Sequence, residues 1–213
     1  MVGQGILREC ILELDVQLVQ TVGRTATGTQ NAKLREVVHA DLWDYRAIEG
    51  SMSGFDACFF CLGVASSGMS EPDYERVTYG ITISAAQVLS RLNPNMTFIY
   101  VSGAGADSSE RGRVMWARVR GKTENALLRM PIKATYIFRP ALIQPLHGIK
   151  SRTATYRLLY SLTAPLLPML RRVMPGYIST TEQIGRAMLI VARNGAPKPI
   201  LESRDIVEIT QAK

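Results

Sequence analysis

The sequence has only three cysteines, Cys10, Cys58 and Cys61, among 213 residues. Cys58 and Cys61 have the C-x-x-C spacing of a redox or metal motif, but they lie in the apolar run ACFFCLG, which is typical of a buried strand. Residues three apart on a strand point to opposite faces, so the two thiols should not meet. We therefore expect core packing and no metal site, and the odd number of cysteines suggests a reducing compartment.

Long hydrophobic runs and blocks of one charge are also missing. The most apolar stretch, residues 158–170, is too short to span a bilayer and contains two prolines. No signal peptide is recognisable, and we expect a cytoplasmic protein. The net charge is +7, but the basic residues are scattered singly with few aromatic residues between them, which argues against nucleic-acid binding. An anionic cofactor or an acidic membrane remains a candidate partner for the basic carboxyl-terminal half.

What the sequence does contain is an alternation of strand-like and helical segments. Strands are expected at 16–23, 34–40, 56–63, 96–103 and 134–140. Several are continuous apolar runs, as in parallel strands covered on both faces. A long amphipathic helix follows the third strand, with a capping box of Ser70 and Asp73, and a second helix is expected at 114–129. The pattern predicts an α/β fold with a doubly wound, mostly parallel sheet and helices on both faces.

The pattern changes after Pro140. Residues 141–178 combine a loop with a basic, leucine-rich stretch, and STTE at 179–182 is a second capping box that opens a helix. A short strand at 199–202 and a helical turn follow. We expect one domain, 1–213, whose tail forms a small cap over the carboxyl edge of the sheet, where open α/β sheets bind ligands. Residues 155–173 can also form a dimer face or lie on a membrane, although a cap is the better interpretation.

Two glycines, Gly3 and Gly5, come directly before an apolar helical run. In a Rossmann fingerprint a Gly-rich turn joins the first strand to a helix, and its backbone amides approach a pyrophosphate. Gly3 fits the last glycine of such a turn, although a glycine helix cap explains it about as well. Arg24 lies about 20 residues after this turn, at the position that contacts the cofactor ribose in a Rossmann fold. An arginine there favours the 2′-phosphate of NADP, and an exposed turn residue is the alternative.

These segments together resemble the atypical, extended-type short-chain dehydrogenase/reductases, in the branch of the human Tat-interacting-protein oxidoreductase and its bacterial relatives. The resemblance covers nearly the full length and rests on VGQGILREC, TVGR, HADLWDY, DACFFCLG, YVSGAGADSSERG, WARVRGKTENALL, FRPALIQP and TTEQIGRAML. It implies a Rossmann domain that binds NADP(H), with NAD as the second choice. Relatives carry a first strand and a Gly-rich turn immediately before the MVGQG segment, so we expect upstream residues that complete the pyrophosphate site.

The resemblance also implies which residues contact the cofactor. They are Gly3 at the pyrophosphate, Arg24 at the 2′-phosphate, Asp41 and Leu42 at the adenine, Leu62 and Gly63 beside the ribose, Ser102 near the nicotinamide, Arg120 at a ribose hydroxyl or phosphate, and Pro140 with its successors at the nicotinamide amide. These positions follow from the family motifs and not from spacing alone.

The catalytic pair of the family is missing. Short-chain dehydrogenases use Tyr-x-x-x-Lys, in which the tyrosine exchanges a proton while the lysine lowers its pKa and holds the ribose. None of the eight tyrosines has a lysine four residues later, and the matching place is Trp116-x-x-x-Arg120. An indole N–H cannot exchange a proton near neutral pH, whereas Arg120 can still bind the cofactor. Ser102 and His147 remain as polar candidates, although a surface histidine is the better interpretation of His147.

The expected function is therefore an NADP(H)-binding oxidoreductase or epimerase-like protein with an unspecified small-molecule substrate. The alternative is a non-catalytic dinucleotide-binding or redox-sensing module that acts through a protein partner. A homodimer fits either function.

Overall fold

The computed structural model describes residues 1–149 and 176–211. Its strands are β1 (Val19–Gly23), β2 (Leu34–Val38), β3 (Ala57–Phe60), β4 (Thr97–Val101), β5 (Ala134–Arg139), β6 (Leu142–Gln144), β7 (Ile178–Thr180) and β8 (Ile200–Glu202). Its helices are α1 (Val2–Leu12), α2 (Glu71–Glu75), α3 (Ile81–Leu92), α4 (Met115–Leu128), α7 (Thr181–Asn194) and α8 (Ser203–Ile209), with a 3-10 helix η1 (Arg46–Ser51) and a π-helical turn η2 (Arg76–Gly80).

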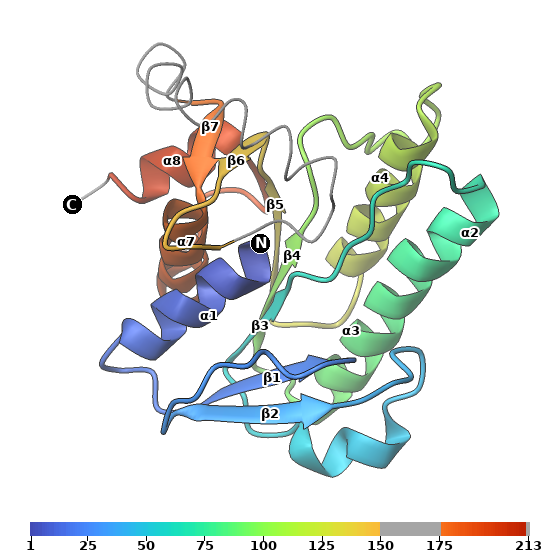
Figure 1. The fold of residues 1–213 in the computed structure, drawn as a ribbon. Coiled ribbons are helices and arrows are strands. Elements are labelled where there is room, and N and C mark those ends of the chain that lie inside the picture. Colours follow the sequence, from blue (N-terminus) through green and yellow to red (C-terminus); the bar gives the residue numbers. More distant parts are fainter. Residues whose placement is uncertain (150–175, 212–213) are drawn as a thin grey trace.

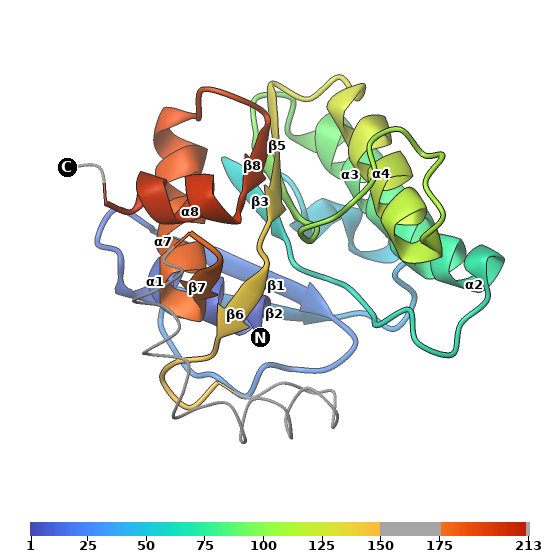
Figure 2. The ribbon, with the colours of Figure 1, turned by 90° about the horizontal axis from the view of Figure 1, so that it is seen from above.

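Every strand pair within the described residues is parallel, which confirms the expected α/β class. Four strands form the central sheet in the order β3-β4-β5-β8, while β1 pairs with β2 and β6 with β7 in two smaller sheets. Helices α1, α7 and α8 lie on one side of the central sheet, and α3 and α4 lie on the other (Figures 1 and 2). The β6–β7 pair was not expected, because the sequence indicated a loop and a basic, leucine-rich stretch at 141–178 and a helix start at 179–182.

The capping box predicted at Ser70 and Asp73 is present. The Ser70 hydroxyl accepts a hydrogen bond from the Asp73 backbone N–H at 3.3 Å and donates one to the Asp73 carboxylate at 2.5 Å. The helix that follows is not uniform, since its middle turn, η2, is π-helical and joins α2 to α3. Asn93, which precedes Pro94, is the C-cap of α3.

The second capping box lies one residue later than the sequence predicts. Thr180, not Ser179, is the N-cap of α7: its side chain accepts from the backbone N–H of Gln183 at 3.0 Å, and the Gln183 side chain accepts from the backbone N–H of Thr180 at 3.1 Å. The Ser179 hydroxyl is instead buried beside Ser203 of α8, 3.4 Å away. Tertiary packing therefore chose between two hydroxyl residues that are equivalent in the local pattern.

The cysteines are core residues, as expected. Cys58 packs on the hydrophobic cluster between the central sheet and α3, whereas Cys61 packs on the cluster that contains α1 and α7. Both thiols and that of Cys10 are free, and desolvation by burial raises the pKa of each to about 12. No group of metal-ligating side chains occurs among the described residues.

The second glycine of the N-terminal motif has a packing role. A Cβ atom on Gly5 of α1 would lie 2.6 Å from the backbone oxygen of Thr181, and a Cβ atom on Gly185 of α7 would lie 3.3 Å from the backbone of Gly5. The two helices therefore approach closely at paired glycines, and larger residues would force them apart.

The predicted cap, residues 141–178, falls only partly within the described chain, where it contributes β6 and β7. The segment 155–173, considered for a membrane or dimer contact, lies outside the described residues. None of the helices in residues 1–149 and 176–211 combines the length and apolar character needed to cross a bilayer.

Candidate functional site

Three parallel strands of the central sheet end side by side, and the residues after them form the candidate site. Leu62 and Gly63 come shortly after β3, residues 102–105 follow β4, and Pro140 follows β5. Because β4 lies between β3 and β5, these three segments are neighbours. This carboxyl edge is the place where open α/β sheets bind ligands.

Arg120 reaches this edge from α4. Its Nη1 atom lies 3.4 Å from the position that a Cβ atom on Gly103 would occupy, and its Nη2 atom lies 3.9 Å from the corresponding position at Gly63. The guanidinium group therefore lies between the ends of β3 and β4, where the two glycines leave room for it. Its Nε donates a hydrogen bond of 3.1 Å to the hydroxyl of Tyr74.

The charge of Arg120 has no carboxylate partner within residues 1–149 and 176–211, where the Tyr74 hydroxyl is its hydrogen-bond acceptor. Desolvation acts to lower the pKa of Arg120, but Tyr100, Tyr74 and Glu124 outweigh that effect and raise it. A desolvated cation without a counter-ion is costly, so the position suits an anionic or hydroxyl-rich ligand.

Trp116 lies one helical turn before Arg120 and packs on the turn that follows β4. Its Cη2 atom lies 3.5 Å from the position of a Cβ atom on Gly105, whose φ of +87° is in the region that favours glycine. The structure therefore brings Trp116, Arg120 and this turn together. The catalytic roles assigned to the two side chains remain predictions.

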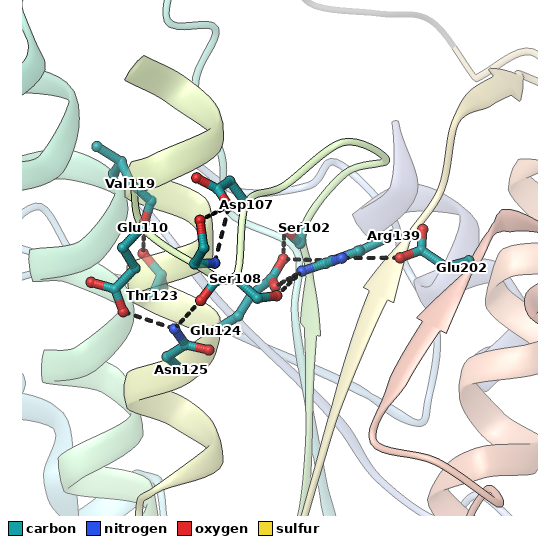
Figure 3. Close-up of polar contacts among 11 residues, drawn as sticks. Ser102, Asp107, Ser108, Glu110, Val119, Thr123, Glu124, Asn125, Arg139 and Glu202 are labelled. Carbon is teal, nitrogen blue, oxygen red and sulfur yellow. Dashed lines mark hydrogen bonds and ion pairs between the residues drawn. The ribbon is translucent and has the colours of Figure 1, made fainter. Parts of the chain in front are cut away.

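Ser102 is engaged by a buried ion pair (Figure 3). Its hydroxyl donates a hydrogen bond to Glu124 of α4, whose exposed fraction is 0%. Arg139, 8% exposed at the end of β5, donates from Nε to both carboxylate oxygens of Glu124, at 3.1 and 3.2 Å. The same guanidinium donates to the Ser108 hydroxyl at 2.7 Å and to Glu202 at 3.0 Å.

This network ties the carboxyl ends of β4, β5 and β8 to α4 and to the loop before it. Because the Ser102 hydroxyl donates its hydrogen bond to Glu124, a proton-transfer role for Ser102 would first require that hydrogen bond to break. The predicted position of Ser102 near the nicotinamide stays a prediction. At the same edge of the sheet, the backbone carbonyl of Pro140 accepts a hydrogen bond from the backbone N–H of Ala104 at 3.0 Å.

The loop between β4 and α4 is organised by Asp107. Its carboxylate accepts hydrogen bonds from the Ser109 hydroxyl at 2.6 Å and from the Gly112 backbone N–H at 2.6 Å. These bonds hold the pKa of Asp107 below its usual value. Arg118 fastens the loop from α4 by donating to the Gly112 carbonyl at 2.6 Å, and it also pairs with Glu71 of α2 at 2.6 Å.

His147 has a different partner. Its Nε2 lies 2.7 Å from a carboxylate oxygen of Glu182 in the first turn of α7, and this hydrogen bond lowers the pKa of Glu182. Its φ of +56° places the backbone in the left-handed region. Within the described part of the chain, no hydrogen bond joins His147 to Ser102, Trp116 or Arg120, so the structure does not connect it to the strand-end cluster.

The residues predicted to contact the adenine, the ribose and the 2′-phosphate differ in their exposure to solvent. Arg24 follows β1, is exposed and makes no hydrogen bond or ion pair within residues 1–149 and 176–211. Asp41 is exposed, and its carboxylate accepts from the Trp43 backbone N–H at 2.9 Å. Leu42 is buried in the core, whereas Leu62 is exposed at the end of β3. Their cofactor roles stay predictions.

Gly3 lies in the first turn of α1, beside the end of β3. A Cβ atom on Gly3 would lie 3.4 Å from the Cβ atom of Cys61, the residue that follows β3. The amino-terminal end of α1 is therefore close to the carboxyl edge of the sheet, where a phosphate-binding helix end belongs. Its contact with a pyrophosphate stays a prediction.

Three residues of the site were missed by the sequence analysis: Tyr74, Glu124 and Arg139. Arg139 had a usable signal, because a charged residue ends the otherwise apolar strand ATYIFR. Glu124 and Tyr74 had none, since a single glutamate or tyrosine on an amphipathic helix does not reveal its burial.

Several solved structures have a similar fold. WbmF of Bordetella bronchiseptica in complex with NAD+ is 12% identical, with a TM-score of 0.64, and the match covers 99% of this chain and 74% of that one. This chain has a Rossmann-like fold. UDP-galactose 4-epimerase is 15% identical with a TM-score of 0.63, covering 95% and 72%, and a short-chain dehydrogenase/reductase of Saccharomyces cerevisiae is 12% identical with a TM-score of 0.61, covering 96% and 92%.

One curated relative corrects an expectation. The chain is 27% identical over 204 residues to Protein FMP52-2, mitochondrial, of Scheffersomyces stipitis, which is 92% of this chain and 83% of that protein. No family model matches the chain. Because this relative is a mitochondrial protein, it contradicts the expected cytoplasmic location. That expectation rested on the lack of a recognisable signal peptide and on the odd number of cysteines.

Proposed function

We propose that this protein binds a nicotinamide dinucleotide at the carboxyl edge of the central sheet and acts as an oxidoreductase or epimerase-like protein. We place it among the atypical short-chain dehydrogenase/reductases, in the branch of the Tat-interacting-protein oxidoreductase. The observation that carries the proposal is Arg120, a cation without a carboxylate partner in the described chain, held between Gly63 and Gly103. WbmF, which shares the fold, was solved with NAD+ and with NADH, and this supports a dinucleotide as the ligand.

The residues of this chain have distinct tasks in such a site. Arg120 binds a phosphate or a ribose hydroxyl with its two terminal amino groups, and Gly63 and Gly103 leave room for its guanidinium at the strand ends. Trp116 takes the place of the family's tyrosine and covers Gly105, but its indole does not exchange a proton near neutral pH. A bound nicotinamide would supply hydride exchange, which the protein side chains cannot.

The first test is removal of the Arg120 side chain. We expect Arg120→Ala to weaken NADPH binding about tenfold or more, because charge-assisted hydrogen bonds contribute about 1.5–3 kcal/mol each. Fluorescence titration of the full chain with NADPH measures the dissociation constant.

Arg118→Ala is the matched control on the same helix. Arg118 contacts Glu71 and the Gly112 carbonyl rather than the strand ends, so its loss should leave the dissociation constant within about twofold of wild type, a smaller change than loss of one charge-assisted bond produces. Binding of NADPH by Arg120→Ala at wild-type affinity would contradict the proposed site.

The second test concerns the choice between NADP and NAD. Arg24 is exposed after β1 and carries a forked donor suited to a 2′-phosphate. We expect the wild-type protein to bind NADPH more tightly than NADH and Arg24→Glu to abolish this preference. Arg129→Glu, the same charge change just beyond the end of α4, should retain it. Equal affinities of the wild-type protein for the two dinucleotides would exclude Arg24 from phosphate recognition.

A further inference from the structure

Helix α2 lies alongside α4 (Figure 1). Three side chains of α2 contact cationic side chains of α4. Two of these contacts are ion pairs with N–O distances of 2.6 Å, Glu71–Arg118 and Glu75–Lys122. The third differs in kind, because Arg120 meets the neutral hydroxyl of Tyr74 rather than a carboxylate.

Tyr74 is held rigidly although it belongs to a short surface helix. Its exposed fraction is 1%, while Pro72 and Asp73 beside it are exposed. The Ser70 cap fixes the start of α2, and the Tyr74 backbone N–H donates to the Ser70 carbonyl at 3.0 Å. A buried phenol usually needs a hydrogen-bond partner, and here that partner is Arg120.

The contact has a specific consequence for the guanidinium of Arg120. The group is planar, with a fixed fork of five N–H donors, and the bond from Nε to Tyr74 sets the direction of the fork. Nη1 and Nη2 then lie toward Gly103 and Gly63, with no carboxylate on either within the described residues. A carboxylate at position 74 would orient the group too, but it would cancel the charge that an anionic ligand needs.

We propose that Tyr74 is the positioning residue of the dinucleotide site: its hydroxyl orients Arg120 without neutralising it, so that both terminal amino groups meet a phosphate or ribose hydroxyl at the ends of β3 and β4. This inference rests on the proposed function and adds to it a residue that the Tyr-x-x-x-Lys motif does not contain. Tyr74 is buried behind Arg120 and acts through it.

The test is Tyr74→Phe in the full chain, with NADPH as the probe. The substitution keeps the buried ring and removes only the acceptor, so the melting temperature checks that the fold is intact. We expect the dissociation constant for NADPH to rise about three- to tenfold. Tyr79→Phe is the control, because Tyr79 lies on the neighbouring turn under Lys122 and away from Arg120, and it should bind as wild type does.

A double-mutant cycle separates positioning from a general structural effect. If Tyr74 acts through Arg120, Tyr74→Phe combined with Arg120→Ala should bind NADPH no more weakly than Arg120→Ala alone. Additive losses, or wild-type affinity in Tyr74→Phe, would overturn the inference while leaving the proposed function standing. A wild-type protein that binds neither NADPH nor NADH would overturn both.

Discussion

Arg139→Ala is expected to lower the free energy of unfolding by about 3–5 kcal/mol, because it leaves the carboxylate of Glu124 buried without its cation. Glu124 is fully buried, and Arg139 supplies its ion-pair partner from the end of β5. The loss is a large part of the stability of about 5–15 kcal/mol that is typical of a domain. Denaturant unfolding followed by circular dichroism measures it.

Two controls show whether the buried pair causes the loss. Glu202→Ala removes the second carboxylate partner of Arg139. The Glu202 side chain is 47% exposed, so its loss should lower the free energy of unfolding by about 1 kcal/mol or less. Replacing both buried partners, with Glu124→Leu and Arg139→Met, should cost less than Arg139→Ala alone, since no buried charge is then left unpaired. An Arg139→Ala protein within about 1 kcal/mol of wild type would show that the Glu124 carboxylate is solvated or neutral.

Gly121→Ala is expected to destabilise the protein by about 3 kcal/mol or more. A Cβ atom at this position of α4 would lie 1.7 Å from the backbone oxygen of Asp107 and 3.0 Å from the backbone nitrogen of Ser108. These are backbone atoms of the loop between β4 and α4, so no side-chain rotation relieves the overlap. Thermal unfolding of the purified variant tests the expectation.

Gly50→Ala is the matched substitution at an open position. No atom lies within 4 Å of a Cβ atom at Gly50, and its φ is not in the left-handed region. The free energy of unfolding should therefore change by about 1 kcal/mol or less. Similar losses of stability in Gly50→Ala and Gly121→Ala would mean that the close approach of the loop to α4 does not explain the effect at Gly121.

The local pattern of the sequence was enough to predict most of the elements. Each of the six predicted strands is present, and α4 begins and ends close to the predicted bounds, 114–129. The spacing of Cys58 and Cys61 on a predicted strand also indicated correctly that the two thiols face different clusters. Such features follow from side-chain periodicity and capping, which neighbouring residues in the sequence decide.

The Trp116–Arg120 spacing likewise predicted that both side chains lie on one side of α4, because residues four apart on a helix are neighbours. What the spacing did not contain was their surroundings. Arg120 meets Tyr74, 46 positions away, and Ser102 meets Glu124, 22 positions away, so these hydrogen bonds depend on how α2, β4 and α4 pack together. The same dependence moved the cap of α7 from Ser179 to Thr180.

The sequence by itself thus determined the order of strands and helices and the residue types at the carboxyl edge, since both arise from local periodicity and motif spacing. Only the tertiary structure decided which charges are neutralised. Packing gave Arg139 a buried carboxylate in Glu124 but gave Arg120 a phenol in Tyr74, and it thereby left the second cation without a carboxylate ion-pair partner within the described residues. That difference is electrostatic, and it arises from distances between residues far apart in the sequence, which no local pattern records.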